Sequence, residues 1–228
     1  MIANRIGTWI PPENAHTCCP PGELEPADGV AHVVVATLMR SGTHLLIDLL
    51  LNNFPKYRKR SLYVNMDRFI RDDHLIDQLL AAGGQVLKTH YPQIGDSDSN
   101  RVRVLPILAR SRVILVERDR EDIRRSMARF GDWGTQQLHD LDAQFDRFDA
   151  FWDQRDGGLR VHFDDLIDPV RCARVLDRLS SFLDLRCSTV PVFPRPKAAR
   201  NRVYLDKLMT RLVGRSAPRV NTTIGFSI

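Results

Sequence analysis

Cysteine is scarce in this chain, with four residues in 228, and their spacing argues against two classes of protein. Cys18 and Cys19 are adjacent, while Cys172 and Cys187 stand alone. There is therefore no CxxC pair and no Cys/His spacing of the kind that holds structural zinc. Nor does this arrangement form the regular disulfide framework of a small secreted domain. We expect a protein of a reducing compartment that binds no metal.

Long apolar runs are also missing. No stretch approaches the roughly 18 apolar residues of a membrane helix, and the N-terminus lacks the charged and apolar regions of a signal peptide. The sequence therefore predicts a soluble, cytoplasmic protein without a transmembrane segment. Hydrophobic residues make up 43% and charged residues 27% of the chain, which is the composition of a folded domain and argues against wholesale disorder.

An excess of acidic charge is absent as well. Lys and Arg outnumber Asp and Glu by 33 to 28, which leaves a net charge of +5. A basic chain can bind an anionic nucleotide, a nucleic acid or an acidic surface. Because the arginines are spread along the chain and not gathered in one block, we expect no nucleic-acid partner.

The length suits one domain with an ample core. Residues 1–29 are rich in proline and are typical of an extended N-terminal arm. We expect residues 30–228 to form one α/β domain. The prolines of the arm are Pro11, Pro12, Pro20, Pro21 and Pro26.

Apolar runs alternate with helical periodicity, which predicts a central parallel β-sheet flanked by helices. The expected strands are Val33–Ala36, Gln85–Pro92, Ser111–Val116 and Leu159–Phe163. The expected helices are His44–Asn53, Asp73–Ala82, Arg101–Arg110, Arg120–Phe130, Asp132–Arg155, Pro169–Leu185 and Val203–Leu212. The stretch Ser61–Phe69 favours neither a strand nor a helix.

The first strand leads directly into a short polar loop, Arg40-Ser41-Gly42-Thr43, and then into a helix. A tight loop before a helix directs several backbone N–H groups and the positive end of the helix dipole at one point. Arg40 adds a fixed cation, and Ser41 and Thr43 add hydroxyl groups. This pattern predicts a phosphate-binding loop, although a plain strand-to-helix turn is an alternative.

Two residues of the usual nucleoside-triphosphate loop are missing here. That loop has the form G-x-x-x-x-G-K-[ST], with a lysine after the second glycine. In this chain Thr43 follows Gly42, and Thr37 stands where the first glycine would be. The loop therefore suits a phosphate but lacks the lysine that binds the β- and γ-phosphates.

Polar groups follow the next two strands. Lys88 and His90 lie two residues apart at the end of the second strand, so they point to the same side. Arg118 ends the third strand, and Ser126 lies two turns along the next helix. Since ligands of open α/β sheets lie at the carboxyl ends of strands, we expect Arg118 and Ser126 to bind a second anion. The alternative for Arg118 is a surface ion pair with a neighbouring aspartate, worth little energy.

Four stretches in this order resemble the sulfotransferases that use 3′-phosphoadenosine 5′-phosphosulfate (PAPS). The loop at Arg40 is similar to their 5′-phosphosulfate loop in its arginine form. Lys88-Thr89-His90-Tyr91-Pro92 resembles the segment that carries the catalytic histidine. Arg118 with Ser126 has the spacing of the 3′-phosphate motif, and Phe163-Asp164-Asp165-Leu166 resembles a later Y-E-D-L segment. The resemblance covers about residues 30–185.

The resemblance implies sulfuryl transfer to a hydroxyl acceptor, such as a small molecule, a glycan or a lipid, without a metal. It implies that His90 is the general base and that Lys88 and Arg40 stabilise the charge of the transferring group. The residues that it implies for PAPS binding are Arg40, Ser41, Gly42, Thr43, His44, Leu45, Arg118, Ser126, Phe163 and Arg219.

Three positions depart from the family pattern. Leu45 stands where a tryptophan usually stacks on adenine, and His44 replaces a threonine. The C-terminal clamp of the 3′-phosphate has only a partial match at Arg219. A P-loop kinase or nucleotide phosphotransferase therefore stays open as an alternative, as do a non-catalytic nucleotide-binding module and a basic nucleic-acid-binding module.

Overall fold

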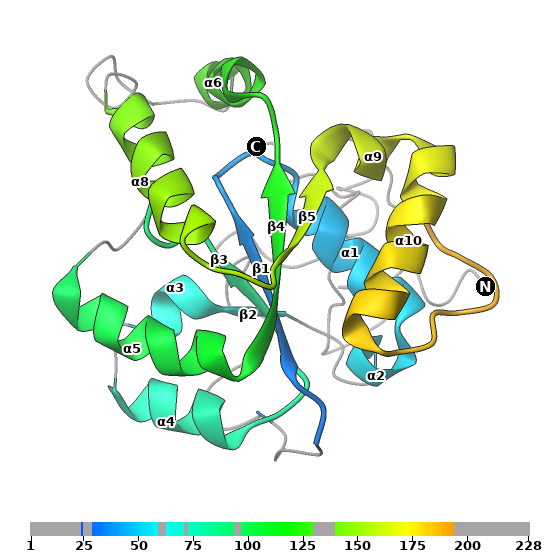
Figure 1. Cartoon of the computed structure of the whole chain (residues 1–228), viewed down its shortest axis with the longest axis horizontal. Coiled ribbons are helices and arrows are strands. Elements are labelled where there is room, and N and C mark those ends of the chain that lie inside the picture. Colours follow the sequence, from blue (N-terminus) through cyan, green and yellow to red (C-terminus); the bar gives the residue numbers. More distant parts are fainter. Residues whose placement is uncertain are drawn as a thin grey trace, which may run out of the picture.

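The centre of the molecule is a parallel sheet, seen in a computed structural model that describes residues 24, 29–58, 63–70, 73–93, 97–129 and 140–193. Its five strands lie in the order β2-β3-β1-β4-β5, and every neighbouring pair is parallel (Figure 1). Their bounds are β1 His32–Thr37, β2 Tyr63–Asn65, β3 Val86–Thr89, β4 Ser111–Glu117 and β5 Leu159–His162.

Strand β1 occupies the middle of the sheet, and all six of its residues are buried. Val33 and Val35 pack into the core on one face, whereas Val34 and Ala36 pack into the core on the other. A strand with two covered faces requires a continuous apolar run and not an alternating one. The prediction of a buried parallel strand here is therefore confirmed.

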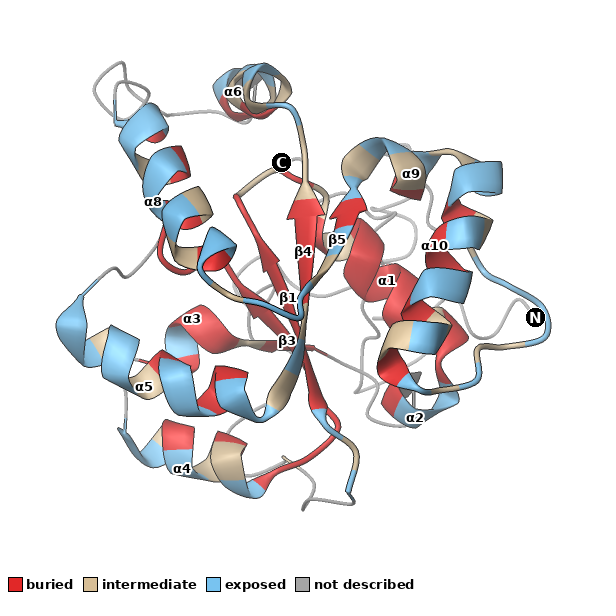
Figure 2. Ribbon diagram, in the orientation of Figure 1, coloured by how far each residue is buried: buried red, intermediate tan, exposed pale blue. Residues whose placement is uncertain are grey.

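Helices cover both faces of the sheet (Figure 1). Buried side chains of α1 (Thr43–Asn53), α2 (Pro55–Arg58), α9 (Phe163–Ile167) and α10 (Pro169–Leu183) form one core. Those of α3 (Met66–Phe69), α4 (Asp73–Ala81), α5 (Asp98–Ala109), α6 (Arg120–Arg129) and α8 (Leu141–Asp153) form the other. Figure 2 shows exposed residues on the outer sides of α4, α5, α8 and α10 and buried ones toward the sheet, whereas α1 has no exposed residue.

The predicted α/β architecture, with a P-loop-like connection after the first core strand, is thus correct. Among the described residues, no helix combines the length and the apolar character that crossing a bilayer requires.

Several element boundaries differ from the prediction for local reasons. Strand β3 ends at Thr89 and not at Pro92, because the next backbone N–H, that of His90, donates to the Asp67 carboxylate and not to a neighbouring strand. Helix α5 begins at Asp98, three residues early, because the Ser97 hydroxyl caps it by accepting from the Asn100 N–H. Helix α10 ends at Leu183 because Asp184 adopts the left-handed conformation (φ 53°).

The stretch Ser61–Phe69, for which the sequence favoured no element, contains both β2 and α3. The predicted helix over 132–155 is described only from residue 140, where it contains α8. Most of the predicted N-terminal arm and the predicted helix Val203–Leu212 lie outside the described residues.

Candidate functional site

The loop between β1 and α1 is curled by two residues with positive φ. Arg40 has φ 69° and Gly42, the N-cap of α1, has φ 95°. A tight loop before a helix, here one of 11 residues, can direct backbone N–H groups at one point, where an anion binds well. The order of strand, loop and helix is the one that the sequence predicts, and phosphate binding by the loop stays a prediction.

Gly42 is required here for a second reason besides its φ. A Cβ atom at this position would lie 2.6 Å from Cδ2 of Phe163, closer than such atoms can approach. The Phe163 ring, which we assigned to nucleotide binding, thus packs directly against the loop backbone. In the structure, this ring therefore packs against the loop at Gly42 and limits the residue type there to glycine.

The two buried hydroxyl groups of the loop, those of Thr43 and Ser41, differ in their hydrogen bonding. Thr43 Oγ1 is 2.6 Å from Thr37 Oγ1, so these two hydroxyls form a hydrogen bond. Ser41 is fully buried, and its Oγ has no hydrogen-bond partner among the described residues. A buried hydroxyl without a partner costs about 1–3 kcal/mol, which makes Ser41 Oγ a group that a ligand oxygen would satisfy.

Arg40, Arg118 and Ser126 come together beside this loop. Arg40 Nε donates to Ser126 Oγ at 3.2 Å, and Arg118 Nη1 donates to the Arg40 carbonyl at 2.7 Å. The Arg118 guanidinium also lies 4.0 Å from the centre of the Phe163 ring, and its Nε is buried without a partner among the described residues. We predicted two separate anion sites, but the structure joins their residues into one continuous basic cluster.

Burial and mutual repulsion both act on the two guanidinium groups of this cluster. Burial lowers the pKa of Arg40, and the nearby Arg118 lowers it further. Burial also lowers the pKa of Arg118, although Asp122 and Asp164 oppose that effect. Guanidinium groups stay protonated at neutral pH in any case. A bound anion would therefore relieve the repulsion between these two side chains.

The alternative of a surface ion pair for Arg118 is not what the described residues show. Asp122 pairs with Arg125 at 2.5 Å, and Asp119 caps α6 by accepting from the Asp122 N–H. Arg118 instead contacts the loop and Phe163.

His90 lies just beyond the end of β3 and is 7% exposed. Its Nδ1 is 2.7 Å from the Thr37 carbonyl oxygen at the end of β1. Because a carbonyl can only accept, Nδ1 carries the hydrogen and Nε2 carries the lone pair. The structure thus holds His90 in the tautomer in which Nε2 can act as a base.

Lys88 is almost fully buried, with 3% exposure. Val86 packs into the core on the α1 face and Leu87 into the opposite core. Since side chains alternate along a strand, Lys88 lies on the α1 face, on the side of the sheet where the loop leads into its helix.

Sequence reasoning missed Asp67 and Gln93. Asp67 lies between β2 and the end of β3, where it accepts from the Thr89 hydroxyl at 2.6 Å and from the His90 N–H at 3.0 Å. Gln93 accepts from the Met39 N–H at 2.7 Å, which ties the turn after β3 to the loop. No pattern marks either residue, because both act through contacts between segments that are distant in sequence.

His44 and Leu45 occupy the first turn of α1. His44 Nε2 is 3.2 Å from the Tyr63 hydroxyl, with the two rings edge to face. Leu45 is 8% exposed and packs in the core on the α1 side. Arg219, the remaining predicted site residue, lies outside the described residues.

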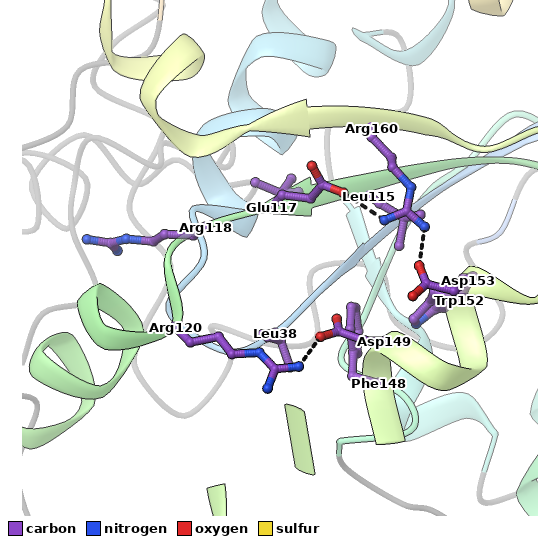
Figure 3. Close-up of a pocket in the computed structure, with 11 residues that line it drawn as sticks. Leu38, Leu115, Glu117, Arg118, Arg120, Phe148, Asp149, Trp152, Asp153 and Arg160 are labelled. Atoms are coloured by element: carbon purple, nitrogen blue, oxygen red, sulfur yellow. Dashed lines mark hydrogen bonds and ion pairs between the residues drawn. The ribbon is translucent and has the colours of Figure 1, made fainter. Parts of the chain in front are cut away.

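A pocket of about 290 Å³ lies between the end of β4 and α8 (Figure 3). Arg160 pairs with Glu117 at 2.7 Å and with Asp153 at 2.6 Å, and Arg120 pairs with Asp149. Figure 3 shows Arg118 pointing away from these ion pairs. Carboxylates therefore match the charges of both Arg120 and Arg160 in the lining of this pocket. Among the described side chains, no group of three or more His, Cys, Asp or Glu could hold a metal ion.

Comparison with family models gives no match, and no curated protein matches the chain. Among solved structures, a shikimate kinase from Bacteroides thetaiotaomicron has a TM-score of 0.46 at 11% identity, covering 68% of this chain and 99% of its own. A sugar kinase from Janibacter sp. HTCC2649 has a TM-score of 0.41 at 14% identity, covering 68% of this chain and 95% of its own. Both are kinases, the class of our alternative prediction, but similarity at this level assigns no activity.

Proposed function

We propose that this protein transfers a sulfuryl group from PAPS to a hydroxyl acceptor. The observation that supports this proposal is the basic cluster of Arg40, Arg118 and Ser126 beside the buried Ser41 hydroxyl. A nucleotide with phosphates at both its 5′ and 3′ positions needs two anion contacts close together. The loop would hold the 5′-phosphate, and Arg118 with Ser126 would hold the 3′-phosphate.

The chemistry would rest on positioning and on charge stabilisation, as in phosphoryl transfer. His90 Nε2 would take the proton of the acceptor hydroxyl while its oxygen forms a bond to sulfur. The bond from sulfur to the bridging phosphate oxygen would break, and 3′-phosphoadenosine 5′-phosphate (PAP) would leave. Arg40 and Lys88 would stabilise the negative charge that develops on the bridging oxygen.

A nucleotide phosphotransferase is the second candidate, and two residues favour it. Thr43 places a hydroxyl at the start of α1, and Asp67 places a buried carboxylate in the first turn of α3, the helix that follows β2. A hydroxyl and a carboxylate are the side chains with which P-loop enzymes hold Mg²⁺. Against it stands the missing lysine after Gly42.

A binding experiment separates the two candidates. We expect PAP to raise the melting temperature of the full chain, whereas ATP with Mg²⁺ leaves it unchanged; at a ligand concentration of 100 Kd the stabilisation amounts to about 2.7 kcal/mol. The converse result would favour the phosphotransferase, and the sulfotransferase proposal would then be wrong.

Turnover is measured with sulfur-labelled PAPS and a panel of hydroxyl acceptors. If His90 is the base, His90→Gln should lower the rate by about 10²–10⁴-fold, while the affinity for PAP stays within about twofold. Retention of the full rate in this variant would reject His90 as the base and leave the nucleotide assignment intact.

A further inference from the structure

A buried carboxylate fixes the backbone from which His90 projects. Asp67 follows β2, is 6% exposed, and has both carboxylate oxygens 3.0 Å from the His90 backbone nitrogen. The Thr89 hydroxyl donates to Asp67 Oδ1 at 2.6 Å and accepts from the Tyr91 N–H at 3.0 Å. One side chain thus organises three consecutive residues at the point where the chain leaves the sheet.

The outer two of these residues have contacts elsewhere: Thr89 pairs with Ala36 of β1, and the Tyr91 carbonyl accepts from the Trp152 Nε1–H at 2.9 Å. Strand β3 ends at Thr89, so His90 is the first residue beyond the ladder, and its backbone N–H donates to Asp67. A buried N–H without an acceptor is costly, and Asp67 supplies that acceptor. The backbone of His90 is therefore held by the segment after β2.

The ring of His90 is held from the other side. Its Nδ1 contacts the Thr37 carbonyl, which belongs to β1, the strand that leads into the phosphate-binding loop. The imidazole can keep this contact only while its Cα stays in place. The Asp67 contact fixes the backbone of His90 and the Thr37 contact orients its ring, so both help to set where Nε2 lies relative to the loop.

We propose that Asp67 is a positioning residue, which holds His90 in the orientation and tautomer needed for proton abstraction. Its effect on turnover rests on the proposed sulfotransferase function, whereas its effect on the His90 tautomer does not. Asp67 itself touches no reacting atom in this scheme.

The test uses Asp67→Ala and the nearly isosteric Asp67→Asn in the full chain, with Asp77→Asn on the exposed side of α4 as a matched control. We expect ¹⁵N NMR of the imidazoles to show the Nδ1–H tautomer of His90 in the wild type and the control. Asp67→Ala should give a mixture of tautomers. The His90 signals are assigned by their loss in His90→Gln.

Turnover provides the second readout. A misplaced base typically costs about 10²-fold in rate, so kcat should fall by that factor in Asp67→Ala while the Kd for PAP stays within about twofold. Asp67→Asn keeps one acceptor oxygen and should show a smaller loss. In a His90→Gln background, Asp67→Ala should lower the rate little further, because the two residues act through one group.

Three results would overturn the proposal. These are an unchanged His90 tautomer in both Asp67 variants, unchanged turnover in both, or an equal loss of turnover with and without His90. If Asp67→Ala does not fold, the His90 tautomer and the turnover are compared between the wild type and Asp67→Asn alone. If the wild type transfers no sulfuryl group, the proposed function fails, while the tautomer measurement still decides whether Asp67 positions His90.

Discussion

Arg40 is the residue at which backbone strain, burial and charge coincide. Its left-handed φ of 69° costs a non-glycine residue about 1–2 kcal/mol. Its pKa is lowered by burial and by Arg118. Three unfavourable features at one position are typical of binding sites, where a ligand offsets them. We therefore regard Arg40 as the centre of the candidate phosphate site.

Gly42→Ala should damage both the fold and the site. The new Cβ would meet Phe163 at 2.6 Å in a backbone with φ 95°, so we expect about 1–2 kcal/mol of strain and a further 1–3 kcal/mol of overpacking. Gly157→Ala is the control, because it has φ 82° and no atom within 4 Å of the added Cβ. Chemical denaturation should show a clearly larger loss for Gly42. Equal losses would mean that Phe163 does not constrain the loop.

Arg118→Gln should weaken nucleotide binding. Hydrogen bonds to charged groups contribute about 1.5–3 kcal/mol, which corresponds to a 10–100-fold rise in the Kd for PAP measured by calorimetry. Arg112→Gln is the matched control, because Arg112 lies near the amino end of β4, whereas Arg118 follows the carboxyl end of the same strand. A loss of affinity that is the same in both variants would place the 3′-phosphate elsewhere.

At the scale of elements, Asp168 caps α10 by accepting from the N–H groups of Val170 and Arg171 at 2.9 Å. Its pKa is lowered, mainly by the hydrogen bond from Arg171. A lowered pKa in the folded state means that the charged form adds stability above the ordinary pKa, and that this stability is lost as the pH falls through the folded value.

Asp168→Ala should therefore lower the melting temperature at neutral pH, since it removes the cap. Asp168→Asn keeps an acceptor but no charge, so its deficit should be smaller and should shrink below about pH 4. Asp177→Asn, an exposed position in the same helix, controls for general charge effects. A deficit of Asp168→Asn that is independent of pH would contradict the role of the charge.

Strands with strong local patterns were predictable from the sequence. β1 and β4 are apolar runs that the core requires on both faces. β2 was not predictable, because three residues that end in Asn65 are too short to show a period. The start of α5 depends on a single hydrogen bond from the Asn100 N–H to the Ser97 side chain, which periodicity does not reveal.

The candidate site divides in the same way. The loop residues and the strand-end residues could be predicted because they directly follow the apolar runs of β1, β3 and β4 in the sequence. The contact between Arg40 and Ser126 could not, since it joins residues 86 positions apart. Asp67 could not be predicted either. Its role depends on the hydrogen bond that it accepts from the His90 N–H, and this bond forms only when β2 and β3 pair.

At the scale of the whole molecule, the net positive charge is concentrated near the C-terminal end of the sequence, although arginines occur along the whole chain. Residues 194–228 contain eight Lys and Arg and one Asp, a net charge of +7, so residues 1–193 carry −2 of the total of +5. Within the described residues, many arginines have carboxylate partners, including Arg103, Arg120, Arg124, Arg125, Arg160 and Arg171. We therefore expect the described residues to contribute little to non-specific binding of polyanions.

This distribution separates two kinds of anion binding. We expect the full chain to bind a labelled DNA duplex only in the weak, non-specific range, with a Kd of about 10⁻⁴–10⁻⁶ M that rises steeply with salt. Substituting Gln for Arg195, Lys197, Arg200 and Arg202 should weaken duplex binding and reduce its salt dependence, while Arg118→Gln leaves duplex binding unchanged.

For PAP we expect the reverse, because its phosphates would contact the loop and Arg118. Fluorescence anisotropy at two salt concentrations measures the duplex, and calorimetry measures PAP. Tight duplex binding that depends on Arg118 would instead make the basic cluster of Arg40, Arg118 and Ser126 a nucleic-acid site.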